Sequence, residues 1–215
     1  VISTELTREE YSKIILITQN KIKKILTPKI FLHNQKEHII KIFKTNKFLV
    51  QRYFYLRAQL PALLKKSNQP VNFHRESFFG SINDNLFNCW IPIKNNVKNN
   101  SLFYIPNSHK FIQGKDFKIS ETNKKSKIFK GSNSHKIGLL YKEKKILFLK
   151  KIKKKRMYFK NKYIIFNGEI IHGNAINNTN NIRFSLDMRF TKNIKIENKV
   201  QSATNQKYYL KTCLK

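Results

Sequence analysis

The spacing of hydrophobic positions differs between the two parts of the chain. From residue 7 to about 67 apolar residues recur at helical intervals; the first run ends at Thr27-Pro28, and further helices are predicted over 35–45 and 47–66. After residue 70 the period changes to two, which is typical of β-strands. We predict strands over 71–76, 86–93, 101–105, 163–166, 169–172 and 181–190, and a lysine-rich hairpin formed by 146–149 and 157–160.

This succession of short strands predicts a sandwich or barrel, for which a double-sheet jelly roll is one solution. The fold class is therefore mainly β with N-terminal helices (α+β), in the form of a double-stranded β-helix. The 215 residues suffice for one domain. We divide it into helical cladding over 1–70, a jelly-roll core over 71–190 and a polar C-terminal tail over 191–215.

Charge is the most conspicuous feature of the composition. The chain has 44 Lys and Arg against 12 Asp and Glu, a net charge of +32, which favours nucleic acid, anionic membranes or anionic small molecules as partners. However, 37 of the 44 cations are lysine, and asparagine and isoleucine are also abundant. Because these three residue types share A/T-rich codons, genome composition is an alternative source of the charge.

Other features exclude several classes of protein. Two cysteines are too few for a disulfide scaffold or a cysteine-rich zinc module. No run of 18 apolar residues is present, and residues 1–7 lack the pattern of a signal peptide. We therefore expect a cytoplasmic protein without a membrane partner.

The candidate chemistry begins at His74 and Glu76. On a strand, a spacing of two places both side chains on one face, where a nitrogen and an oxygen ligand could serve an iron(II) facial triad. His172, which ends an apolar run and precedes Gly173, is a candidate third ligand. The alternatives are a chance His-x-Glu and a half-buried structural histidine.

A second candidate site lies in residues 181–190, which alternate cleanly. Arg183, Ser185, Asp187 and Arg189 share one face of the predicted strand. An Arg and a Ser two residues apart can hold a carboxylate through a guanidinium fork and a hydroxyl. The alternative is an edge strand with a solvated polar face, which would suit Asp187 and Arg189.

The order His74-x-Glu76, His172, Arg183-x-Ser185 resembles that of the iron(II)/2-oxoglutarate-dependent dioxygenases, most closely the phytanoyl-CoA dioxygenase-like branch. Residues 87–93 (FNCWIPI), 101–110 (SLFYIPNSHK) and 163–173 also resemble segments of that branch. In this chain Glu76 replaces the commoner Asp. Asn107 stands where the family usually has Gly, so we expect Asn107 in the left-handed region.

The resemblance implies a jelly roll that holds Fe(II) through His74, Glu76 and His172, with 2-oxoglutarate as cosubstrate and O₂ as oxidant. Arg183 would pair with the distal carboxylate of 2-oxoglutarate, assisted by Ser185. The implied lining of the cosubstrate pocket is Trp90 and Asn88.

The implied reaction is hydroxylation of a C–H bond in a small, possibly anionic molecule of carbohydrate, nucleotide-linked or secondary-metabolite type. The carboxylate at Glu76 favours hydroxylation over halogenation, because related halogenases leave this position vacant for halide. The alternative function is a basic nucleic-acid-binding module without catalysis. Its best feature is the lysine-rich stretch 142–162, where aromatic residues that could stack bases are interleaved: Phe148, Tyr158 and Phe159.

Overall fold

A computed structural model of the chain describes residues 8–62, 73–79, 86–125, 142–159, 162–192 and 209–214. Its helices come first: α1 (Arg8–Ile25), α2 (Pro28–Asn34) and α3 (Lys36–Phe43). The predicted break at Thr27-Pro28 is confirmed, because the Thr27 side chain accepts a hydrogen bond from Ile30 N and Pro28 starts α2. Among the described residues, no helix combines the length and the apolar character that a membrane span requires.

The larger sheet, here called the major sheet, has strand order β11-β1-β10-β3-β8. β2 pairs with the part of β10 that β1 does not cover, so β10 has neighbours along both edges. The strand pairs are antiparallel. The strands are β1 (Lys47–Gln51), β2 (Tyr55–Gln59), β3 (Leu86–Lys94), β8 (Ile164–Asn167), β10 (Arg183–Thr191) and β11 (Tyr209–Cys213).

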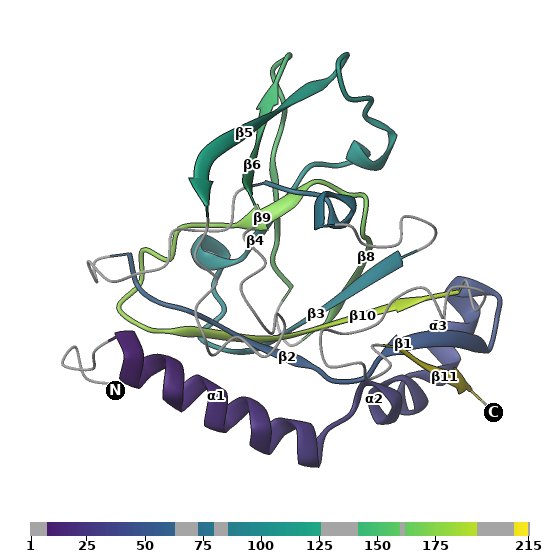
Figure 1. The fold of residues 1–215 in the computed structure, drawn as a ribbon. Helices are drawn as coiled ribbons and strands as arrows, with labels where there is room; N and C mark the ends of the chain where they lie inside the picture. The colour runs from purple at the N-terminus through teal and green to yellow at the C-terminus, as the bar shows by residue number, and fades with distance from the viewer. Residues whose placement is uncertain are drawn as a thin grey trace.

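A second, minor sheet faces the first. It consists of β7 (Lys155–Met157), β4 (Leu102–Tyr104) and β9 (His172–Asn174), in that order, and is extended by an isolated bridge between His74 and His172. A separate hairpin, β5 (Phe117–Lys125) with β6 (Lys142–Phe148), stands beyond the minor sheet, while the helices lie beneath the major sheet (Figure 1). Short 3₁₀ helices are η1 (Glu76–Phe79), η2 (Lys98–Asn100) and η3 (Ser108–Lys110).

The two faces of β10 explain this layering. Leu186, Met188 and Phe190 pack into the core that joins the helices to the major sheet. The opposite face, which begins with Arg183 and Ser185, points between the two sheets, where a second core is formed by Trp90, Leu102, Met157 and Phe166. Two facing antiparallel sheets with this strand order form the predicted jelly roll.

The helix predicted over 47–66 is wrong, because residues 47–51 and 55–59 form β1 and β2. Their apolar residues satisfy a helical period almost as well as a strand period, and pairing with β10 decides the outcome. The side chain of Gln19 in α1 secures the turn between them, donating to Phe54 O (2.7 Å) and accepting from Leu56 N (2.6 Å). The C-terminal tail is also more than peripheral, since its β11 pairs with β1.

Two further strand predictions need correction. The segments expected to form one lysine-rich hairpin belong to different sheets, because β6 pairs with β5 whereas β7 pairs with β4. The strand expected over 71–76 is reduced to the single bridge at His74, and the chain enters η1 at Glu76; residues 71 and 72 lie outside the described part. The expected left-handed conformation of Asn107 is confirmed, with φ of 60°.

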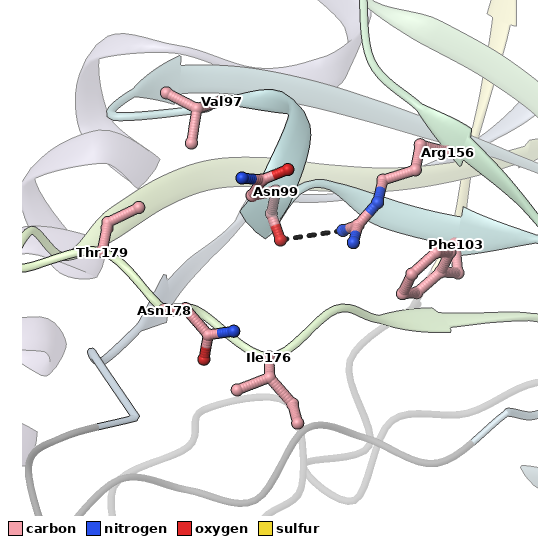
Figure 2. A pocket seen from close by; sticks show the side chains of 7 residues that line it. All are labelled: Val97, Asn99, Phe103, Arg156, Ile176, Asn178 and Thr179. Atoms are coloured by element: carbon pink, nitrogen blue, oxygen red, sulfur yellow. Dashed lines mark hydrogen bonds between the residues drawn. The ribbon is translucent and has the colours of Figure 1, made fainter.

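A pocket of about 310 Å³ opens on the outer face of the minor sheet (Figure 2). Phe103 and Arg156, which are partners in the β4–β7 register, form one side of it. The Arg156 guanidinium lies 4.0 Å from the centroid of the Phe103 ring and donates to Asn99 O at 2.8 Å. The remaining lining residues are Val97, Ile176, Asn178 and Thr179.

Candidate metal centre

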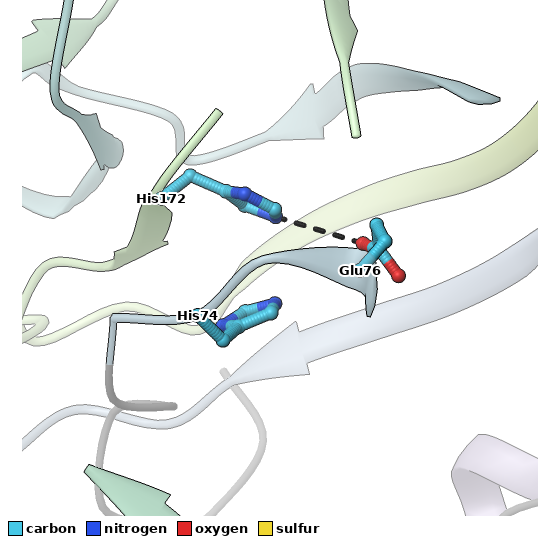
Figure 3. Close-up of side chains that lie close together, drawn as sticks. All are labelled: His74, Glu76 and His172. Atoms are coloured by element: carbon cyan, nitrogen blue, oxygen red, sulfur yellow. Dashed lines mark ion pairs between the residues drawn. The ribbon is translucent and has the colours of Figure 1, made fainter. Parts of the chain in front are cut away.

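The three predicted ligands meet at one place between the sheets. The candidate ligand atoms of His74, Glu76 and His172 all lie within 4.8 Å of one another, and the side chains converge in Figure 3. The two histidines are held together by their backbones, with His74 N donating to His172 O (2.9 Å) and His172 N donating to His74 O (3.0 Å). Their ring centroids are 4.4 Å apart.

Glu76 reaches this place through a turn and not along a strand. Its backbone N donates to Gly168 O (3.0 Å), and Gly168 N donates to Leu86 O (2.8 Å). A Cβ added at Gly168 would lie 3.2 Å from both Glu76 Cγ and Leu86 O, which is tighter than ordinary packing. The glycine of the predicted 167–168 turn therefore lets the carboxylate side chain pass close to the backbone.

The Glu76 carboxylate is buried and surrounded by compensating groups. Its Oε2 lies 2.6 Å from Arg189 Nη2, in a close charge contact without aligned hydrogen-bond geometry, and its Oε1 accepts from Asn88 Nδ2 at 2.9 Å. Burial by itself raises the pKa of Glu76. Arg189, the two histidines and the Asn88 hydrogen bond outweigh it and hold the pKa below its ordinary value. The carboxylate is therefore ionised at neutral pH, as a metal ligand must be.

His172 is prepared as a neutral ligand. Burial lowers its pKa below the ordinary value, although the nearby Glu76 carboxylate opposes this effect. Its Nδ1 lies 2.8 Å from Ile170 O, and because a carbonyl only accepts, Nδ1 carries the proton. The lone pair is then on Nε2, the atom 3.7 Å from Glu76 Oε1.

Two imidazole nitrogens and one carboxylate oxygen form the donor set that suits iron(II) in a facial triad. Asn88 engages Oε1 and Arg189 engages Oε2 of the carboxylate, and Nδ1 of His172 is engaged by a backbone carbonyl. The hydrogen bonds of Asn88 and of the Ile170 carbonyl orient the two candidate ligands, and Arg189 compensates the charge of the carboxylate. The residues present therefore fit this metal in identity, ionisation and placement.

The second candidate site is a buried cation. Arg183 is 2% exposed, with Nη1 donating to Asn100 O (2.6 Å) and Nη2 to the Asn174 side chain (3.1 Å). Within the described part of the chain, no carboxylate lies within 4 Å of this guanidinium, and neither Arg183 Nε nor the fully buried Ser185 Oγ has a hydrogen-bond partner. Burial lowers the pKa of Arg183 to about 10, with Asp187 opposing, so the cation persists at neutral pH.

An isolated buried cation is costly unless an anion reaches it. Arg183 Nε and Ser185 Oγ are two unpaired donors on one face of β10, which fits a carboxylate ligand such as the distal end of 2-oxoglutarate. The guanidinium carbon also lies 5.5 Å from the centroid of the Trp90 ring. Of the two residues predicted to line the cosubstrate pocket, Trp90 lies beside Arg183, whereas Asn88 donates to the candidate metal ligand Glu76.

The role of Arg189 was missed by the sequence reasoning, which allowed it a solvated face. β10 is not an edge strand: β2 and β1 cover one side and β3 the other, so its polar face looks into the jelly roll. Asp187 pairs with Arg57 on β2 (2.8 Å) at a more open position. The signal that could have placed Arg189 inside was the spacing of two that it shares with Arg183 and Ser185.

No family model matches the chain, and no curated protein matches it. It is similar to the solved structures of AviO1 from Streptomyces viridochromogenes Tue57 (12% identity, TM-score 0.38) and of SnoN, a non-haem alpha-ketoglutarate-dependent epimerase from nogalamycin biosynthesis (10%, 0.43). These matches cover 68% and 74% of this chain, and the chain spans about half the length of either protein, 52% in both cases. A third similar structure is the nickel complex of the non-haem monooxygenase ThoJ (9% identity, TM-score 0.43). This match covers 85% of this chain and 67% of ThoJ.

The fold of this chain is a jelly roll with a cluster of His74, Glu76 and His172 between its sheets.

Proposed function

We propose that the chain is an iron(II)- and 2-oxoglutarate-dependent oxygenase that hydroxylates a C–H bond of a small molecule. The observation that carries the proposal is the pairing of two prepared sites on one jelly-roll interior. One is a neutral-imidazole and carboxylate cluster with ligand atoms within 4.8 Å, and the other is a buried guanidinium without a carboxylate partner in the described structure. A metal and a dicarboxylate would satisfy both.

The protein's part in metal binding follows from the geometry. Arg189 occupies Oε2 of Glu76, whereas Oε1 faces His172 and accepts one hydrogen bond, from Asn88, so the second lone pair of Oε1 is available to a metal. His172 offers Nε2 because Nδ1 is engaged by Ile170 O. Three single-atom donors leave three positions of an octahedron for other ligands. With iron and 2-oxoglutarate bound, O₂ would be the oxidant: one oxygen atom would enter succinate as 2-oxoglutarate loses CO₂, and the other would become the hydroxyl of the product.

The protein's part in cosubstrate binding rests on Arg183. Its Nη atoms are fixed by Asn100 O and Asn174, so the guanidinium is oriented before any ligand arrives. Nε and Ser185 Oγ remain to hold the carboxylate, and the buried setting strengthens that interaction relative to water. Pre-organisation of this kind stabilises the complex because no side chain has to be reordered.

We propose membership of the phytanoyl-CoA dioxygenase-like branch on the strength of two segments. Residues 87–93 fall within β3 and residues 102–104 form β4, and the left-handed Asn107 makes the turn where the branch usually has glycine. We further propose that the catalytic core consists of residues 71–190 together with β2 (Tyr55–Gln59), since β2 completes the sheet beside Arg183. The substrate is proposed to be a small carbohydrate, nucleotide-linked or secondary-metabolite molecule.

The test is anaerobic titration of the protein with Fe(II) and 2-oxoglutarate, followed by the weak visible charge-transfer band of the chelate. His74→Ala is expected to abolish metal binding, and His109→Ala, which alters an exposed histidine of η3, serves as the matched control. Arg183→Met is expected to retain Co(II) binding while weakening 2-oxoglutarate by about 100-fold, since a buried charged pair is lost.

Succinate release in air completes the test. Loss of both signals in His74→Ala with full retention in His109→Ala would support the proposal. Wild-type protein that binds neither Fe(II) nor Co(II), or Arg183→Met protein with unchanged 2-oxoglutarate affinity, would contradict it.

A further inference from the structure

A second pocket, of about 270 Å³, lies where β4 and β7 diverge. We call it the lysine pocket; its lining is Ile105, Pro106, Phe111, Lys151, Ile152, Lys153 and Lys155. Its apolar residues come from both sides of the gap, and all three of its charged residues are cations. A lining of this kind fits a ligand that has an apolar part and an anionic group.

Two neighbouring lysines of the same segment are engaged by the protein, in contrast to the three of the pocket. Lys150 Nζ lies 2.5 Å from Asp116 Oδ1 and 4.8 Å from the centroid of the Phe111 ring, and Lys154 Nζ lies 4.9 Å from that of Phe73.

Lys151, Lys153 and Lys155 are exposed, and none pairs with a carboxylate in the described part of the structure. The lysines of this segment therefore fall into a pair that is engaged by the protein, Lys150 and Lys154, and the three of the pocket.

The strand register relates this pocket to the metal centre. Lys155 is opposite Tyr104, and Tyr104 is opposite His172, so the three residues form one row across the minor sheet. Residues opposite one another in antiparallel strands have their side chains on the same face. Two strand spacings separate Lys155 from His172, about 10 Å between backbones. A molecule with an anionic group at Lys155 thus has its reacting carbon near the metal if it is of monosaccharide phosphate size.

The pocket beside Arg156 in Figure 2 differs in the features that matter here. Phe103 and Arg156 alternate with Tyr104 and Lys155, so their side chains lie on the opposite face of the minor sheet from that of Lys155. Its cation already donates to Asn99 O and stacks on Phe103. An anion would have to compete with those contacts, whereas it meets no such competition in the lysine pocket.

We propose that the lysine pocket binds the phosphate or pyrophosphate group of the substrate, and hence that the substrate is a phosphate ester of a small molecule. The binding of phosphate does not depend on the proposed oxygenase function, but the statement that this phosphate belongs to the substrate rests on it. A phosphate group at neutral pH carries a charge between −1.5 and −2, which three ammonium groups on one wall compensate. The apolar residues of the pocket then contact the organic part next to the phosphate.

The probe is inorganic pyrophosphate, titrated calorimetrically into the full chain. Changing Lys151, Lys153 and Lys155 together to Ser is expected to weaken pyrophosphate binding by about tenfold or more, the sum of three exposed charge contacts. The matched control changes Lys21, Lys24 and Lys29 to Ser, which removes the same charge from α1 and α2 beneath the other sheet. The control is expected to change binding by less than about twofold, because distant exposed charges are screened.

If the two triple variants weaken pyrophosphate binding equally, the proposal is overturned, because binding would then depend on the overall positive charge of the chain, +32, and not on the pocket. Absence of pyrophosphate binding to the wild-type protein would also overturn it. A single-stranded oligonucleotide that binds far more tightly than pyrophosphate, and is released by the same pocket variant, would replace it with nucleic-acid binding.

Co(II) and 2-oxoglutarate binding, measured on the same variants, separates this inference from the proposed function. The pocket variant is expected to keep both, because Lys155 and His172 lie on strands separated by β4. Wild-type protein that does not bind Co(II) would refute the proposed oxygenase function, whereas the proposal of a phosphate-binding pocket would be unaffected.

Discussion

Replacement of Arg189 by Met is the sharpest single test of the metal centre. Arg189 Nη2 lies 2.6 Å from Oε2 of Glu76; the arginine side chain is 26% exposed and that of Glu76 is 4% exposed. Breaking a fully buried ion pair costs about 3–5 kcal/mol. Because Arg189 is partly open to solvent and Asn88 still supports Glu76, we expect about 2–3 kcal/mol of lost stability in the metal-free protein.

A bound divalent cation would substitute for the missing guanidinium charge. With saturating Co(II), the stability difference between the Arg189→Met and wild-type proteins is therefore expected to shrink to about 1 kcal/mol. The thermodynamic cycle then requires the variant to bind Co(II) about tenfold more tightly, because about 1.4 kcal/mol corresponds to a factor of ten. Urea unfolding with and without Co(II), together with direct Co(II) titration, measures all four sides of the cycle.

Arg57→Met is the matched control. Its partner Asp187 lies on the same strand as Arg189, but both side chains of that pair are more open, at 47% and 34% exposure. Such a pair contributes at most about 1 kcal/mol, and its loss should not depend on Co(II). If Arg189→Met is equally destabilised with and without metal, or binds Co(II) more weakly, then Arg189 positions Glu76 and does not act as a substitute for the metal charge.

Three further changes have defined outcomes. Gly168→Ala should destabilise the fold by about 1–3 kcal/mol and weaken Co(II), since the added methyl would lie 3.2 Å from Glu76 Cγ; chemical denaturation and titration measure this. Asn174→Ala should weaken 2-oxoglutarate several-fold without altering Co(II) affinity, as seen by titrating the charge-transfer band, because Arg183 loses one acceptor. Metal-free wild-type protein should lose stability as pH falls below about 6.5. Burial lowers the pKa of His172 in the folded protein, so below that pH the imidazole is protonated only in the unfolded chain. The free energy of unfolding of His172→Gln should depend less steeply on pH, and an unchanged dependence would contradict this reasoning.

The jelly-roll core could be predicted where a strand alternates and both faces are strongly specified. In residues 181–190 the apolar side chains had to face a core and the polar ones the interior, and β10 follows this pattern. Residues 47–59 carry no such alternation, and residues 47–51 and 55–59 form β1 and β2 because β10 offers an edge to pair with; residues 63–66 of the predicted helix lie outside the described part. Long-range pairing of this kind leaves no mark in the local sequence.

The ligands of the metal centre could be predicted as residue types, but their supports could not. His74 and Glu76 were placed together on the assumption of a strand, whereas a single bridge and a turn at Gly168 deliver them. The turn brings Glu76 under Arg189, a residue 113 positions later that shares no local motif with it. The sequence shows which charged groups are available, but which of them pair with one another depends on the folded sheet.

The arrangement of charges along β10 offers a reason for the order of its polar residues. Arg183 has an unpaired donor in the interior, and Arg189 pairs with Glu76. Asp187 lies between these two arginines along the strand and pairs with Arg57. A neutral residue at position 187 would leave Arg57 without this ion pair. Because Asp187 pairs with Arg57, Arg183 keeps its charge for a ligand carboxylate and Arg189 keeps its charge for Glu76. The same physical rule, that a buried charge must find a partner, thus accounts for the support of the metal ligand and for the open cosubstrate site.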